Sequence, residues 1–206
     1  MSTPASRWLD DRVAGVVLAG GKNSRMGGRD KAFLRVDGEV VVARILSVLR
    51  ECFEQVVVVS NKPDKYAPFG VEVTHDELLG YGPLGGLHAA LGKVRTPYAF
   101  VVACDMPFLR PEPIRFLVSQ LNGQEAIVPC WGGDIEPLHA IYGAALRPRI
   151  AAMLAEGACG LRDFLPHVRA HYVPEAMMKR IDGAEESFRN VNTPEEAARY
   201  AVLLAG

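Results

Sequence analysis

A glycine-rich, basic stretch at residues 18–31, LAGGKNSRMGGRDK, carries residue types suited to binding an anion. Glycines let several backbone N–H groups turn toward one anion, because a Cβ would block the close approach. Arg25 and Lys31 add positive charge suited to phosphate oxygens. The spacing GxxxxGK of a Walker A loop is absent, which disfavours a P-loop kinase or GTPase. We interpret the stretch as a phosphate-binding loop, and a basic surface loop is the alternative.

A carboxylate follows a later apolar run. Residues 98–103 are apolar, and the run stops at Cys104-Asp105-Met106-Pro107. At the carboxyl end of a buried parallel strand, Asp105 would face the same crevice as the glycine stretch. Mg²⁺ in proteins is usually bound by one or two carboxylates, together with waters and substrate phosphates. The sequence predicts Asp105 as a Mg²⁺ ligand, and a cap of the following turn is the alternative.

A dinucleotide-binding site is a competing interpretation. Residues 80–85, GYGPLG, match GxGxxG, and Asp105 follows about twenty residues later, as in that fingerprint. Pro83, however, lacks the N–H that a pyrophosphate cradle requires. Residues 76–79 also separate the glycines from the preceding apolar run. The glycine stretch at 18–31 therefore remains the favoured nucleotide site.

Three asparagines are weaker candidates. Asn61 follows an apolar run and would lie in the crevice, where it could contact a base. Asn190 and Asn192 flank Val191, which places both amides on one side of an extended segment. They are candidates for binding an acceptor, with a purely structural role in a turn and helix cap as the alternative. In the helix start that follows, Thr193 is the expected N-cap and Glu196 completes a capping box.

The elements that must position these residues alternate along the chain. Short apolar runs predict strands, and apolar residues at helical spacing, clearest over 40–53, predict helices. This alternation indicates an α/β fold with helices on both faces of a mostly parallel sheet. Residues 1–12 are expected to form a tail and 13–206 a single domain. The predicted strands are 13–19, 55–59, 71–74, 98–103, 126–129, 138–142 (in a mixed or antiparallel position) and 171–173, and the predicted helices are 40–53, 86–94, 113–121, 146–155 and 161–164.

Composition narrows the class of protein. The chain has 206 residues, 49% of them hydrophobic, and a formal net charge of −1. This charge gives no general attraction to nucleic acid or to an anionic membrane. The four cysteines form no CxxC pair, and Cys52 and Cys104 are expected to be buried, reduced thiols. Without a secretory signal or an apolar run long enough to cross a bilayer, the expected location is the cytoplasm.

The glycine stretch resembles the signature of the nucleoside-triphosphate transferases, and in particular that of the molybdenum cofactor guanylyltransferase family. The pattern is LAGG, then RMGG, then DK. The resemblance continues in order along nearly the whole chain, which makes it specific although each motif alone is weak. The further motifs are GPLGG at 82–86, CDMP at 104–107, EPL at 136–138 and NVNTP at 190–194.

The resemblance implies a Rossmann-like three-layer α/β/α fold and a nucleotidyltransferase. Such an enzyme moves GMP from GTP to molybdopterin or the molybdenum cofactor and releases pyrophosphate, with Mg²⁺ as cofactor. Molybdoenzyme-maturation proteins would be its protein partners, and nucleic acid and membrane would not be. The LAGG pattern has Gly20 where cytidylyl-transferring relatives usually carry the second alanine of LAAG, which favours GTP over CTP. The implied site residues are Leu18, Ala19, Gly20, Gly21, Asn61 and Asp76 for the nucleotide, Arg25 and Lys31 for the triphosphate, Asp105 for Mg²⁺, and Asn190 and Asn192 for the acceptor.

Two other functions stay open at this point. A cytidylyltransferase or a sugar-phosphate nucleotidyltransferase of the same superfamily would share the glycine stretch and Asp105. A non-catalytic module that binds a nucleotide and delivers the cofactor to other enzymes would share them too.

Overall fold

A computed structural model describes residues 9–20, 31–75, 81–157, 160–191, 193 and 195–196. One mixed sheet runs through these residues in the order β10-β7-β9-β6-β1-β4-β5, with β8 added to β7. The strands are β1 Val13–Leu18, β2 Arg35–Val36, β3 Glu39–Val40, β4 Val56–Val59, β5 Glu72–Thr74, β6 Tyr98–Ala103, β7 Ala126–Trp131, β8 Asp134–Ile135, β9 His139–Gly143 and β10 Ala170–Val173. The helices are α1 Val41–Cys52, α2 Gly82–Lys93, α3 Pro111–Ser119, α4 Arg147–Ala155, α5 Leu161–Phe164, α6 Glu175–Met178 and α7 Ala184–Ser187, and the 3₁₀ helices are η2 Lys31–Phe33, η3 Pro63–Phe69, η4 Ala144–Leu146 and η5 Leu165–His167.

The strand directions bring several carboxyl ends to one edge of the sheet. β1 is parallel to both β4 and β6, and β4 is parallel to β5. β9 is antiparallel to β6 and to β7, so β7 runs in the same direction as β6. The mostly parallel sheet and the antiparallel strand predicted near 138–142 are confirmed. The edge where β1, β4, β6 and β7 end is the place where a ligand is expected in such a sheet.

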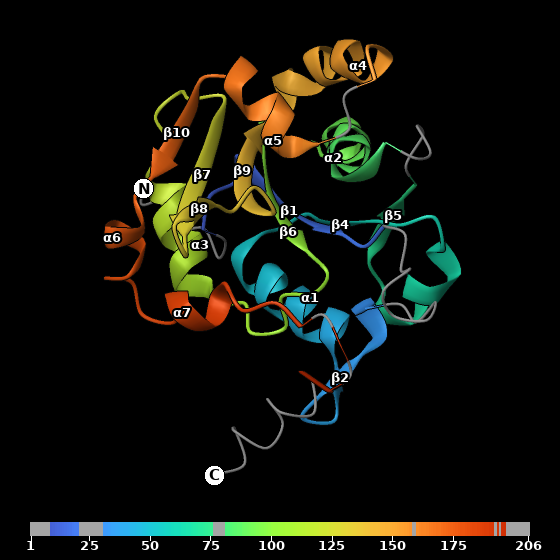
Figure 1. Cartoon of the computed structure of the whole chain (residues 1–206). Coiled ribbons are helices and arrows are strands. Elements are labelled where there is room, and N and C mark those ends of the chain that lie inside the picture. Colours follow the sequence, from blue (N-terminus) through green and yellow to red (C-terminus); the bar gives the residue numbers. More distant parts are fainter. Residues whose placement is uncertain are drawn as a thin grey trace, which may run out of the picture.

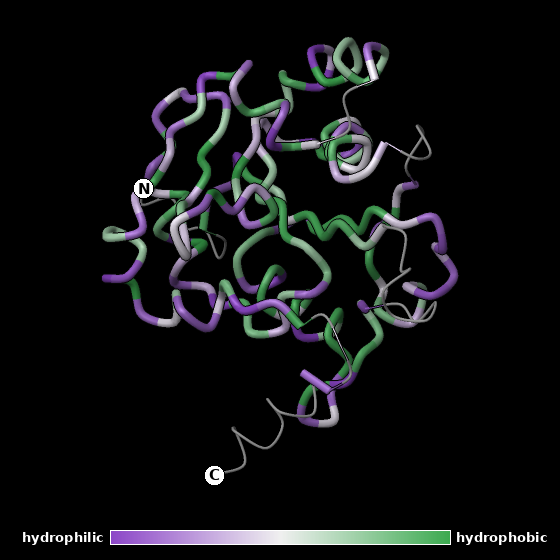
Figure 2. Tube along the Cα trace, viewed as in Figure 1, coloured by the Kyte–Doolittle hydropathy of each residue, from purple (hydrophilic) through white to green (hydrophobic). Residues whose placement is uncertain are grey.

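Helices cover both faces of the sheet (Figure 1). Helices α2, α4 and α5 lie on one face, and α1, α3 and α7 lie on the other. The central strands are hydrophobic along their length because both of their faces are covered (Figure 2). Among the described residues, no helix combines the length and the apolar character that crossing a bilayer requires.

Helix α1 approaches β1 closely at a glycine. Its apolar side chains, Ile45 and Leu49 among them, are fully buried against the sheet, as the helical spacing predicts. A Cβ on Gly15 would lie 2.9 Å from Phe53 Cδ2, which is shorter than a van der Waals contact. Gly15 therefore permits the close contact that fixes α1 beneath β1.

Several boundaries differ from the sequence-based expectation. Helix α2 begins at Gly82, with Pro83 in its first turn, four residues before the expected start. Helix α3 begins at Pro111 rather than Pro113, since either proline suits a first helical turn. Cys52 is buried, but Cys104 is only partly buried because it lies where β6 has already ended. Neither cysteine is in a disulfide.

A fully buried histidine lies near the sheet edge. The His139 ring contacts Phe100 and Phe188, with ring centroids 5.2 Å and 4.5 Å apart. Neither ring nitrogen has a hydrogen-bond partner among the described residues. Burial lowers the pKa of His139 from 6.5 to about 3, so the neutral ring is the stable form in the fold.

We expect acid to destabilise the protein through His139. The unfolded chain takes up the proton below about pH 6.5, whereas the folded chain resists it until about pH 3. The stability that depends on neutral His139 is therefore fully present above pH 6.5 and is lost as the pH falls toward 3. As the pH falls from about 6.5 to 5, the wild type should lose about 2 kcal/mol more of its free energy of unfolding than His139→Leu does. Guanidinium unfolding at each pH measures this. His167→Gln, which removes an exposed histidine, is the control. An equal pH dependence of the unfolding free energy in the wild type and His139→Leu would contradict this prediction.

Candidate active site

Asp105 is held at the end of β6 by two backbone hydrogen bonds and by a buried neighbour. The residue before it, Cys104, donates its N–H to the Leu18 carbonyl at 3.2 Å, which ties the end of β6 to the end of β1. The Asp105 carbonyl accepts the Val191 N–H at 2.8 Å. Met106, the next residue, is buried. The carboxylate is thus fixed at the carboxyl edge of the sheet, with its side chain 19% exposed.

Lys31 reaches this carboxylate from a different part of the chain. Its Nζ donates to Asp105 Oδ2 at 3.0 Å, and the two residues are 74 positions apart. Lys31 opens η2, whose Ala32 is buried and whose Phe33 packs against Tyr66 with centroids 5.3 Å apart. These apolar contacts anchor the lysine backbone, so its side chain projects over the end of β6. The two residues predicted to meet phosphate and metal therefore share one site.

The other described candidates lie along the same edge. Leu18 is buried, Ala19 is partly buried and Gly20 is exposed, in the order expected where a chain leaves a sheet. The Ala19 N–H donates to the Val59 carbonyl at 2.9 Å, which joins the ends of β1 and β4. Asn61 is exposed and follows β4.

The acceptor-side candidates are only partly described. Asn190 is exposed and immediately precedes Val191, whose N–H bonds Asp105. The Thr193 hydroxyl accepts the Glu196 N–H at 3.1 Å, as expected of the N-cap. Four other candidates lie outside the described residues: Gly21, Arg25, Asp76 and Asn192.

Glu136 is a member of the site to which the sequence assigned no role. Burial raises the pKa of its carboxyl, and the negative charges of Asp134 and Asp105 raise it further, against Arg162, which lowers it. Its N–H donates to the Pro129 carbonyl at 2.8 Å, which places it beside β7. The EPL motif that includes Glu136 was the only signal in the sequence, and a motif alone does not show proximity to Asp105.

The geometry disfavours the dinucleotide-binding alternative. The GxGxxG glycines follow β5, at the edge of the sheet, while Asp105 follows β6. Strands β4 and β1 separate these two strands, whereas a dinucleotide fingerprint joins neighbouring strands of one βαβ unit. Gly86 instead packs α2 against β1, since a Cβ there would touch Leu18 Cδ2 at 3.4 Å.

Comparison with known proteins agrees with this arrangement. Residues 15–172 match the family model described as a MobA-like NTP transferase domain. A protein of Pelotomaculum thermopropionicum named a probable molybdenum cofactor guanylyltransferase is 37% identical over 93% of this chain and 93% of its own. The chain belongs to the molybdenum cofactor guanylyltransferase family.

Further relatives place the chain in the same family. A molybdenum cofactor guanylyltransferase of Syntrophotalea carbinolica is 34% identical over 90% of this chain and 89% of its own. The crystal structure of molybdopterin-guanine dinucleotide biosynthesis protein A from Archaeoglobus fulgidus is 25% identical and covers 93% of this chain and 98% of its own, with a TM-score of 0.79. This chain of the guanylyltransferase family is accordingly a nucleotidyltransferase with the family's fold.

Nucleotidyltransferases of this kind generally use a divalent metal ion. The site of this chain fits such an ion. Asp105 offers a partly exposed carboxylate at the crevice. Among the described residues, no three His, Cys, Asp or Glu side chains gather as a complete metal cage. One carboxylate, completed by water and substrate phosphates, is the arrangement typical of Mg²⁺.

Proposed function

We propose that this chain transfers GMP from GTP to the terminal phosphate of molybdopterin or the molybdenum cofactor. The observation that carries the proposal is the contact between Lys31 and Asp105, because it joins a phosphate-binding cation to a metal-binding carboxylate at the ligand edge of the sheet. Membership in the guanylyltransferase family supports the choice of substrates.

In the reaction, an acceptor phosphate oxygen attacks the α-phosphorus of GTP. A new P–O bond forms, the bond from the α-phosphorus to the bridging oxygen breaks, and pyrophosphate leaves. A phosphate monoester is largely ionised at neutral pH, since its second pKa is about 6, so no general base is needed. The chain's task is to align the two substrates and to neutralise their charge.

Each residue has a proposed part in that task. Lys31, together with Arg25, would bind the triphosphate and stabilise charge on the departing pyrophosphate. Leu18, Ala19 and Gly20 would face the base and ribose, and Asn190 the acceptor. Asp105 would hold Mg²⁺, which when bound neutralises phosphate charge and acts as a Lewis acid.

Loss of either charge should reduce the rate strongly while the fold persists. We expect Asp105→Asn and Lys31→Ala each to lower kcat by about 10²- to 10³-fold, the usual effect of removing one group that stabilises developing charge. Pyrophosphate release measures the rate, and circular dichroism checks the fold. Asp64→Asn on η3 and Lys93→Ala at the end of α2 are matched controls that should keep the wild-type rate. Wild-type activity in Asp105→Asn would exclude the metal-binding role.

The nucleotide preference can be tested directly. With Mg²⁺ and molybdopterin, we expect a product mass corresponding to GMP addition from GTP and little product from CTP, ATP or UTP. Pyrophosphate should appear only when both GTP and acceptor are present. Product from CTP would instead indicate a cytidylyltransferase, and nucleotide binding without pyrophosphate release would indicate a delivery module.

The ion pair also predicts coupling between nucleotide and metal binding. In the structure the Lys31 ammonium donates a hydrogen bond to Asp105 Oδ2. Triphosphate binding should draw the ammonium away, so that the carboxylate can bind the metal ion. We expect Lys31→Met to bind Mn²⁺ about 5-fold more tightly than the wild type without nucleotide, at the low end of common coupling factors. Isothermal titration or electron paramagnetic resonance measures this, with Lys93→Met as control. Equal Mn²⁺ affinities in the absence of GTP would contradict the coupling.

A further inference from the structure

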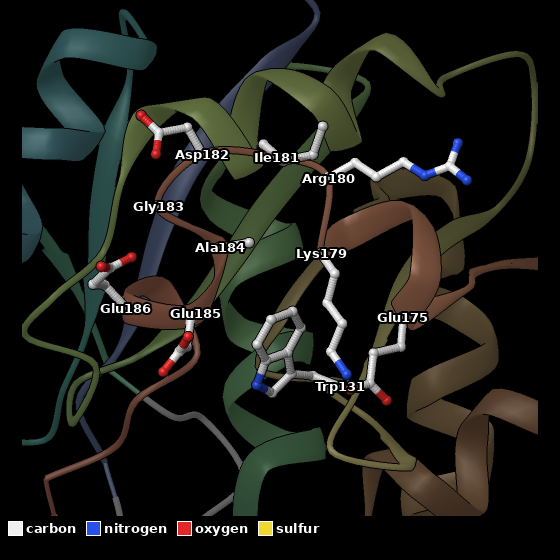
Figure 3. A pocket seen from close by; sticks show the side chains of 10 residues that line it. All are labelled: Trp131, Glu175, Lys179, Arg180, Ile181, Asp182, Gly183, Ala184, Glu185 and Glu186. Atoms are coloured by element: carbon white, nitrogen blue, oxygen red, sulfur yellow. Dashed lines mark ion pairs between the residues drawn. The ribbon is translucent and has the colours of Figure 1, made fainter.

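An open cavity of about 800 Å³ lies beside the end of β7, away from the residues assigned to the nucleotide. Its lining comes from Trp131 and from the chain between Glu175 and Glu186, which includes α6 and the start of α7 (Figure 3). Pockets for small ligands commonly have volumes of about 300–1,000 Å³. The cavity is therefore large enough for a fused heterocycle with substituents.

Trp131 offers an aromatic platform in this cavity. One face of its indole stacks on Phe188, with centroids 4.8 Å apart and planes inclined by 19°. Phe188 is itself buried and packs against His139, so the platform is supported from behind. The Lys179 ammonium lies over the indole, 5.9 Å from its centroid, and pairs with Glu175 at 2.8 Å. A heterocycle that stacks on the indole must therefore displace this lysine side chain, which is 62% exposed. A ring held in this way binds planar heterocycles by stacking.

Carboxylates stand around the platform. In the view of Figure 3, Glu185 lies on the side of the indole opposite to Lys179. Its side chain is 72% exposed and pairs with Arg189 at 2.6 Å, which leaves further acceptor capacity on its oxygens. Carboxylate oxygens accept the adjacent N–H groups of a ring that carries an amide and an amino group. Pterin and guanine both present such an edge.

The cavity lies on the β7 side of Asp105. Phe188 precedes Val191 by three residues, which span at most about 11 Å, and the Val191 N–H bonds the Asp105 carbonyl. Glu136, whose pKa Asp105 helps to raise after the larger effect of burial, bonds Pro129 two residues before Trp131. The nucleotide candidates at the ends of β1 and β4 lie on the other side of β6.

We propose that this cavity holds the pterin ring system of the acceptor, stacked on Trp131, with its phosphate directed toward Asp105. The inference rests on the proposed function, which supplies the acceptor. Guanine has the same hydrogen-bonding edge, but its triphosphate belongs at Lys31 and its base on the β1 side. Trp131 is thus assigned as a residue that determines acceptor specificity.

Steady-state kinetics separate the two heterocycles. Trp131→Ala should raise the KM for molybdopterin by roughly 5- to 150-fold, the range expected for loss of one aromatic stacking partner. The KM for GTP should stay within about twofold, because uniform loss of acceptor binding affects that substrate alone. Trp131→Phe should restore most of the acceptor affinity. Tyr172→Ala, which removes an exposed aromatic ring on β10 outside the cavity, is the matched control.

A second measurement keeps Trp131 in place. The chain has two tryptophans, Trp8 and Trp131, so Trp8→Phe leaves Trp131 as a single fluorescent reporter. Titration with 6-hydroxymethylpterin should quench this emission with saturation, and GTP should not. A Glu185→Gln change in the same background should weaken the pterin titration.

Three results would overturn the assignment. They are an unchanged KM for molybdopterin in folded Trp131→Ala, a rise in the KM for GTP instead, and no saturable quenching by the pterin. The first two require a wild-type enzyme that turns over GTP with molybdopterin, so they leave the proposed function intact. If the wild type forms no product, the proposed function fails, and the fluorescence titration still decides whether the cavity binds a pterin.

Discussion

The candidate site depends on one electrostatic contact, that between the Lys31 ammonium and the Asp105 carboxylate. Neither group is deeply buried, so the pair adds little to stability and its importance lies in position. Parallel strands β1 and β6 end side by side, and the packing of Phe33 brings a lysine from a separate segment over that end. The fold thereby holds two opposite charges ready for two different partners, a phosphate group and a metal ion.

Much of the fold could be predicted because its strands carry strong local signals. A central parallel strand is buried on both faces, so β1, β4 and β6 read as unbroken apolar runs. The position of Asp105 followed from the same logic, since the carboxyl end of a buried parallel strand lies at the ligand edge. The pairing with Lys31 did not follow, because a contact across 74 positions depends on how η2 packs.

The elements and residues that the sequence did not predict have equally local explanations. The hairpin β2–β3 turns at Asp37 and Gly38, both with positive φ, and the Asp-Gly pair was the available signal for a tight turn. Helices α6 and α7 are four residues long, as is the correctly predicted α5, and a segment this short gives only a weak periodic signal. Glu136 and Trp131 gained their significance only from neighbours that come from other strands and from the 175–191 segment.

The antiparallel strand β9 has a geometric consequence. It separates β6 from β7, so Asp105 and Trp131, which follow or end these strands, are at least two strand spacings apart across the sheet, roughly 10 Å. Backbone hydrogen bonds on both sides of β9 fix this separation at residues 126–127 of β7, four residues before Trp131. The sheet thus sets a minimum distance between the ring and the phosphate of the acceptor. A molecule whose ring and phosphate are separated by a much shorter linker cannot occupy the aromatic platform and reach the reacting phosphorus at the same time.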